Sequence, residues 1–195
     1  MELIVQIIEG IFYIWLIKHY KSKQKSVNIT VFRYLDWMLS TNIMLFTLMM
    51  YLSHLQYPSL SITDIYTKHK VTVDNVLILN STMLYFGYLG EIGVITSSKA
   101  VSIGFIPFLA YYKLIYDTFL IPIDNINSLS TISKSDRKQS FVLFWYFFSF
   151  WSMYGFSALL PYTTKNICYN ILDVFSKNFF GLFLSYQLYK KRTQI

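Results

Sequence analysis

The sequence has little charge. Only 14% of its 195 residues are Asp, Glu, Lys or Arg, against about 25% in ordinary soluble domains. No charged residue occurs between residues 37 and 63 or between residues 139 and 164, and each window is longer than the roughly 20 residues that span a bilayer core. Because lipid offers the backbone no hydrogen-bonding partner, we expect these windows to be helices. The absence of charge favours an integral, multi-pass membrane protein.

The sequence is also poor in cysteine. Its single cysteine, Cys168, excludes an intrachain disulfide and a cysteine-based metal site, and no metal is expected. The net charge is +7, and the basic residues gather between apolar segments, at residues 18–25, 134–138 and 190–192. Membrane-flanking charges explain this pattern more simply than nucleic-acid binding does. We therefore expect a lipid bilayer, and no nucleic acid, as the surroundings.

The apolar residues form six segments, at residues 1–20, 32–53, 72–96, 100–121, 140–162 and 166–190. No repeat or change of composition divides the chain, so residues 1–195 are predicted to be a single all-α transmembrane helical-bundle domain. The first segment carries Glu2 and Glu9 and lacks a basic start and a small-residue cleavage site. We therefore expect a helix of the mature protein there, not a signal peptide.

A few charged residues lie inside these segments. Lys177 is near the middle of the last segment, and Asp173, four residues earlier, shares its helix face. In the second segment Arg33 and Asp36 lie within one turn, with Ser40 one turn beyond. The pair in the last segment could be an internal salt bridge that makes both charges tolerable in lipid. Two carboxylates, one arginine and one lysine nearly balance, as buried cations require, and intramembrane charges are usually functional.

Two segments carry a family resemblance. RYLDWMLST at residues 33–41 resembles the third-helix signature of microbial (type 1) rhodopsins, and LDVFSKNFFG at residues 172–181 resembles their seventh-helix signature. Trp151 and Tyr154 match aromatic residues of the family's sixth helix, with Gly155 where many members have proline. The resemblance covers essentially the whole chain and implies a seven-transmembrane rhodopsin-type helical bundle. Six helices are expected here, because residues 1–20 match the family's second helix and leave its first unmatched.

The resemblance implies all-trans retinal as the cofactor. Lys177 would bind it as a protonated Schiff base, Asp36 and Asp173 would be the counterions, and Arg33 would balance the second carboxylate. Ser40 would hydrogen-bond Asp36.

The rest of the pocket also follows from the resemblance. Trp37 and Trp151 would sandwich the polyene, and four further residues would complete the pocket, with ordinary helix packing as the alternative: Met44, Met83, Gly87 and Tyr154. Thr41 is also expected to line the pocket, with a hydrogen bond to Asn80 that could equally be simple contact between helices.

The family includes pumps, channels and sensors, and no enzyme or catalytic residue is expected. Eleven residues after Asp36, where proton pumps of the family have a carboxylate, this sequence has Thr47. FGYLGEIG at residues 86–93 resembles the fourth helix of the viral (algal-virus) rhodopsins, and Asn178 follows the lysine as in their channel-forming members. If the chain is viral, the resemblance implies a host-cell membrane.

Glu2 and Glu9 lie two helical turns apart on one face, and intramembrane carboxylates can select cations. With Asn178 they form a candidate ion path, although Glu2 could instead be a solvated terminus. We therefore predict a light-gated cation channel that binds retinal and conducts cations. The alternatives are a light-driven proton pump, a photosensory rhodopsin, and a non-photoactive membrane receptor or transporter with a structural Asp–Lys pair. Homo-oligomerisation, absorption colour and ion selectivity stay open.

Overall fold

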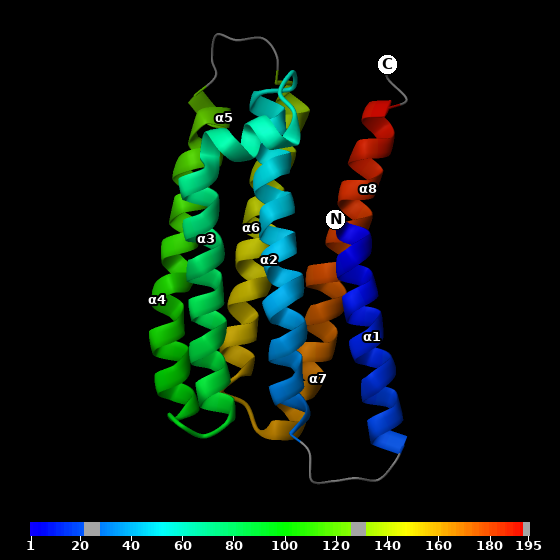
Figure 1. Cartoon of the computed structure of the whole chain (residues 1–195), viewed down its shortest axis with the longest axis vertical. Helices are drawn as coiled ribbons and strands as arrows, with labels where there is room; N and C mark the ends of the chain where they lie inside the picture. Colours follow the sequence, from blue (N-terminus) through cyan, green and yellow to red (C-terminus); the bar gives the residue numbers. More distant parts are fainter. Residues whose placement is uncertain (22–27, 126–131, 193–195) are drawn as a thin grey trace.

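The computed structural model describes residues 1–21, 28–125 and 132–192, which form six helical rods and no strand. The first three rods are α1 (Glu2–Lys21), α2 (Ile29–Gln56) and α3 (Ile62–Glu91). The fourth runs from α4 (Ser97–Ile115) through a π-helical turn, η1 (Tyr116–Leu120), into α5 (Ile121–Asn125). After α6 (Lys134–Ser157), the last rod joins α7 (Tyr162–Asp173) through a second π-helical turn, η2 (Val174–Asn178), to α8 (Phe179–Arg192). Figure 1 shows the rods side by side along one long axis.

The six predicted segments correspond to the six rods, but the predicted bounds of two were wrong. The fifth, predicted at residues 140–162, runs from Lys134 to Ser157, because the Ser133 side chain caps it by accepting from the Asp136 amide. The third differs more. It begins at Ile62, ten residues before the predicted start, because the Ser61 side chain caps it by accepting a hydrogen bond from the Asp64 backbone amide. The charges in its first turns made this stretch resemble a loop. The helix bends at His69, where the backbone is not helical (φ −109°, ψ 16°), and the preceding turns lie across the end of the bundle in Figure 1.

Proline explains the first π-turn. Pro122 has no N–H, and its ring collides with the carbonyl four residues earlier in a regular helix. In η1 the Ile121 amide donates instead to the Tyr116 carbonyl, one residue beyond its α-helical partner. The Gln56 side chain donates to the Phe119 carbonyl at 2.9 Å. The rod therefore continues past the proline to Asn125.

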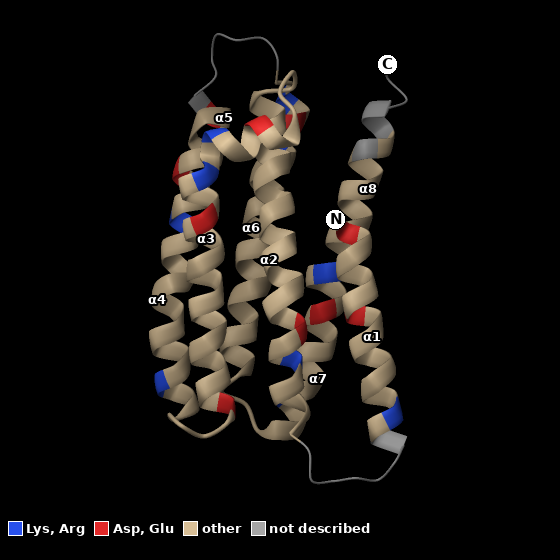
Figure 2. Cartoon of the chain, viewed as in Figure 1, with Lys and Arg blue, Asp and Glu red and all other residues tan. Residues whose placement is uncertain are grey.

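The core lies between the rods and is almost entirely apolar, while many large apolar side chains point outward, among them Leu3, Val71 and Leu109. Two rods, Ile29–Gln56 and Ser97–Asp124, have the length and hydropathy of a membrane span among the described residues. Figure 2 shows most charges near the rod ends, with one group lying midway between α1, α2 and α7. That internal group marks the candidate site.

Candidate functional site

Lys177 lies in η2 and is 2% exposed. Its Nζ donates to Oδ2 of Asp36 on α2 at 2.5 Å, and lies 3.9 Å from Oδ1 of Asp173 at the end of α7. The fold therefore brings together the three charges that the sequence placed on two distant segments. Lys177 Nζ is the atom that becomes the imine nitrogen when a lysine forms a Schiff base.

The two carboxylates have different surroundings. Asp173 is fully buried and accepts four hydrogen bonds: from Arg33 Nη1 (3.0 Å), Tyr13 OH (2.9 Å), Tyr154 OH (2.8 Å) and Trp37 Nε1 (3.3 Å). Within the described residues, Oδ1 of Asp36 has no hydrogen-bond partner. Asp173 is thus held by four side chains besides Lys177, whereas Asp36 has Lys177 as its one charged partner among the described residues, with the Ser40 hydroxyl nearby.

Arg33 is 1% exposed, and its guanidinium is paired with one carboxylate and two amide side chains of α7. Its guanidinium donates to Asp173, to Oδ1 of Asn166 at 3.3 Å and to Oδ1 of Asn170. The Phe12 ring of α1 lies 5.2 Å from the guanidinium carbon, within cation–π range. The sequence did not predict the two asparagines, although Asn166, Asn170 and Asp173 recur at i, i+4 and i+7, which is a polar stripe on one helix face.

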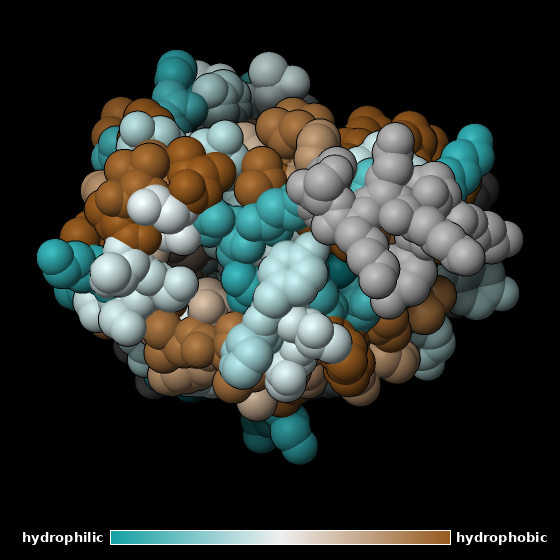
Figure 3. All heavy atoms as spheres, turned by 90° about the horizontal axis from the view of Figure 1, so that it is seen from below, coloured by the Kyte–Doolittle hydropathy of each residue, from teal (hydrophilic) through white to brown (hydrophobic). Residues whose placement is uncertain are grey.

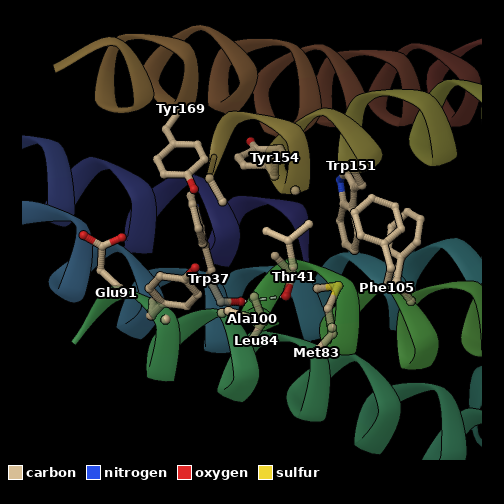
Figure 4. Close-up of a pocket in the computed structure, with 18 of the residues that line it drawn as sticks. Trp37, Thr41, Met83, Leu84, Glu91, Ala100, Phe105, Trp151, Tyr154 and Tyr169 are labelled. Atoms are coloured by element: carbon tan, nitrogen blue, oxygen red, sulfur yellow. Dashed lines mark hydrogen bonds between the residues drawn. The ribbon is translucent and has the colours of Figure 1, made fainter. Parts of the chain in front are cut away.

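An elongated cavity runs from Lys177 between α2, α3, α4 and α6. Its lining is mostly apolar and includes seven residues predicted for the pocket: Trp37, Thr41, Met44, Met83, Gly87, Trp151 and Tyr154. Figure 4 shows Trp151 and Phe105 at one end and Glu91 at the other. The sequence missed Phe105, Phe108 and Tyr169, which are ordinary core residues until the helices are placed.

Glycines allow aromatic rings to approach this cavity. A Cβ added to Gly87 would lie 2.6 Å from the Tyr34 hydroxyl, and one added to Gly155 would lie 2.5 Å from the Phe105 ring. Neither substitution fits unless the ring moves. Gly155, which stands where the family often has proline, therefore leaves room for Phe105 at the pocket end.

The hydroxyl groups of α2 bond mainly to their own helix. Ser40 Oγ donates to the backbone carbonyl of Asp36 at 2.8 Å and also lies close enough to the Asp36 carboxyl group to act on it, so the two residues are in contact as predicted. Thr41 Oγ1 donates to the Trp37 carbonyl at 2.6 Å and accepts from Asn80 Nδ2 at 2.9 Å. The expected Thr41–Asn80 bond is thus present and joins α2 to α3.

The candidate ion-path residues lie on α1 and η2. Glu9 is 5% exposed and close enough to Lys177, Asp36 and Asp173 to interact with their charges. Glu2 is partly buried, and surrounding atoms shield both of its carboxylate oxygens from solvent. Asn178 is partly buried. Gln6, between the two glutamates, donates to the Lys177 carbonyl at 3.4 Å.

An ion pair joins α3 to α7 at the other end of the cavity. Glu91, at the end of α3, accepts from Lys165 Nζ of α7 at 2.6 Å, with side chains 8% and 10% exposed. Asn28 Nδ2 donates to Glu91 at 2.9 Å, and Asn28 Oδ1 caps α2 by accepting from the Thr30 amide. Figure 3 shows hydrophilic residues at the centre of this end of the bundle and apolar residues around its rim.

Comparisons with known proteins agree with this geometry. A family model of bacteriorhodopsin-like proteins matches residues 1–191. The crystal structure of the viral rhodopsin OLPVRII is similar, with a TM-score of 0.71 and 26% identity, over 97% of this chain and 80% of that one. No curated protein matches the chain. The rhodopsin-type bundle predicted from the sequence is confirmed, and its six described rods are consistent with a seven-helix bundle. The chain belongs to the bacteriorhodopsin-like family of multi-pass, retinal-binding membrane proteins.

Proposed function

We propose that the chain is a photoreceptor that holds retinal on Lys177 and opens a cation path in light. The observation that carries this proposal is a buried lysine amine, flanked by two carboxylates, at one point of an apolar aromatic cavity. A lysine is costly to bury in a membrane unless it is paired, and such residues are usually functional. The family supports retinal as the chromophore.

The residues present fit retinal. Trp37 and Trp151 offer flat apolar faces, and Gly155 leaves room at the pocket end. Bound through Lys177, retinal supplies light absorption and a light-driven change of shape. Asp36, 2.5 Å from Lys177 Nζ, would hold a proton on that nitrogen in the dark. Asp173 would act mainly as a fixed charge, since Arg33 and three other donors already occupy it.

The pairing of Lys177 with Asp36 would let the protein respond to light. A change of shape that turns the Lys177 nitrogen, with its proton, away from Asp36 separates the buried carboxylate from its only charged partner among the described residues, while both groups keep their charges. An unpaired buried charge costs several kcal/mol, and water or movement of a helix can relieve this cost. Because Asp36 lies on α2 and Lys177 in η2, such relief would alter the packing of these two elements.

Glu9 supports the cation path. Its carboxyl group is buried in α1 beside the Lys177 cluster, and Glu2 follows two turns away on the same rod. Carboxylates placed in this way attract cations and repel anions. We propose that water and cations pass along α1 by way of Glu9, Glu2 and Asn178.

A light-driven proton pump is the second candidate, because of one observation. Thr47 stands where pumps of the family have a carboxylate, but Glu2 of α1 lies close to Thr47 in space. An acid from a neighbouring helix could therefore return a proton to the Lys177 nitrogen. This placement could not be predicted from the spacing within α2.

Absorption and photocurrents test these proposals. The chain and its Lys177→Ala variant are expressed with all-trans retinal, and visible spectra are recorded. We expect a band only with Lys177; no band with the unsubstituted chain, or equal bands in both, would overturn retinal attachment at this residue. Under voltage clamp, a photocurrent that reverses with the cation gradient supports the channel. A current that keeps its direction at every gradient supports the pump.

A further inference from the structure

The π-turn that carries Lys177 leaves one backbone carbonyl without its α-helical donor. In an α-helix the Phe179 amide would donate to the Phe175 carbonyl, four residues earlier. In η2 it donates instead to the Val174 carbonyl, five residues earlier. The Phe175 carbonyl must therefore find another donor, because an unsatisfied backbone group in an apolar medium costs several kcal/mol.

Tyr146 of α6 supplies that donor. Its hydroxyl donates to the Phe175 carbonyl at 2.6 Å, between residues 29 positions apart. Both residues line an apolar groove on the outer face of α6 and α8, whose other members are Val142, Leu143, Phe179, Phe180, Leu182, Phe183 and Tyr186. In that groove the hydroxyl and the carbonyl satisfy each other.

Aromatic packing fixes the same contact. The Phe150 ring stacks on the Phe175 ring with centroids 5.3 Å apart and an interplanar angle of 12°, and it lies 4.5 Å from the Tyr146 ring. Phe175 in turn contacts Phe179 at 5.2 Å. The outer side of the π-turn is thus held by α6, while Lys177 projects inward to Asp36.

We propose that Tyr146 is a positioning residue for Lys177. Its hydroxyl stabilises η2 in the π-helical form, and this form sets the direction in which the lysine leaves the helix. A π-turn holds one more residue than an α-turn, so conversion of η2 to an α-helix would rotate Lys177 relative to Asp173 and α7. Tyr146 itself does not touch the cavity and acts only through the backbone.

The inference rests on the proposed attachment of retinal to Lys177 for its spectral readout. The test compares Tyr146→Phe, which removes one oxygen, with Tyr186→Phe, which changes an exposed tyrosine of the same groove. We expect Tyr146→Phe alone to form a pigment with a shifted absorption maximum. Its dark bleaching by hydroxylamine should be about fivefold faster, the effect of losing one ordinary hydrogen bond.

A second measurement needs no pigment. Hydrogen–deuterium exchange of the retinal-free chain should be about fivefold faster in peptides that cover Val174–Phe180 in Tyr146→Phe, and unchanged in Tyr186→Phe. Exchange and spectra equal to those of the unsubstituted chain would overturn the inference. So would a uniform rise in exchange over all helices, which indicates general destabilisation. If the unsubstituted chain gives no Lys177-dependent band, the proposed function fails, and exchange still decides the role of Tyr146.

Discussion

Asp36 bonds to Lys177 through Oδ2 at 2.5 Å, and Lys177 is its only charged partner among the described residues. Asp173 lies farther from the amine, at 3.9 Å, and has four other donors. The two carboxylates are therefore unequal counterions, although the sequence alone gave no reason to rank them.

Asp36→Asn should move the pigment band to longer wavelength. The nearest negative charge stabilises positive charge at the Lys177 nitrogen in the ground state, and its removal narrows the gap to an excited state in which that charge moves away. Visible spectra at one pH, beside Asp173→Asn, check the prediction. A larger shift in Asp173→Asn than in Asp36→Asn would reverse the ranking.

Asp173→Asn should instead weaken the fold. It leaves the Arg33 guanidinium, 1% exposed, without its carboxylate, and breaking a buried ion pair costs about 3–5 kcal/mol. Thermal unfolding in detergent should show a clear fall in melting temperature. The control is Asp117→Asn, since Asp117 pairs with Lys113 on the surface and surface pairs contribute little. An equal fall in melting temperature in both variants would contradict a stabilising role for the Arg33–Asp173 ion pair.

Gly155→Val should reduce retinal incorporation about tenfold or more. Its Cβ would lie 2.5 Å from the Phe105 ring, so the ring must move into the cavity or the helices must separate. Gly10→Ala is the matched control, because no atom lies within 4 Å of the position of its added Cβ. Titration with retinal gives the fraction of pigment formed. Normal incorporation in Gly155→Val would show that Phe105 can move away from the cavity.

Glu91 and Lys165 should be energetically coupled. Glu91→Gln leaves the buried Lys165 amine without its anion, while a double change to glutamine removes both charges. A double-mutant cycle on thermal stability should give a coupling of about 1–3 kcal/mol. The same cycle on the exposed Lys70–Asp74 pair should give almost none. If the stability losses of the two single variants add up to the loss of the double variant, the residues are not coupled and water replaces the ion pair without cost.

Glu9→Gln should lower the cation photocurrent about fivefold or more and move the absorption maximum little. Its carboxylate is close enough to act on the Lys177 cluster by charge, but it makes no hydrogen bond to Lys177. Removing it takes a negative charge from the proposed path. Asp64→Asn, at the exposed start of α3, is the control for surface charge. An unchanged current in Glu9→Gln would exclude Glu9 from the path.

The charged centre of the site could be predicted because charges are rare in these helices. Asp173 shares the helix face of Lys177 at a spacing of four residues, whereas the pairing of Lys177 with Asp36 was expected from the resemblance to microbial rhodopsins, since Glu9 also lies in an apolar segment. Tyr13 could not be found in this way. Tyrosine is common throughout the chain, and nothing marks this one until the helix that faces it is known.

The two π-turns show a similar contrast. Pro122 signals a local disturbance in the fourth rod, because proline cannot donate within a helix. No proline accompanies η2, whose carbonyl is satisfied by Tyr146 from a different helix. Proline alone does not predict a π-turn, since Pro107 lies within the α-helix α4, but Pro122 marks a position where one can form, whereas the second turn depends on tertiary contacts.

The distance along the chain between the charged partners has a consequence for biosynthesis. Asp36 and Arg33 meet Lys177 and Asp173 across 141 and 140 positions of sequence, so α2 enters the membrane long before α7 has been translated. Arg33 and Asp36 are three residues apart on one helix and can neutralise each other during that interval. The arrival of the last helix then exchanges one local ion pair for two long-range ones. The site is thus completed only in the final stage of insertion, and a chain that ends before residue 177 lacks the lysine to which we propose that retinal attaches.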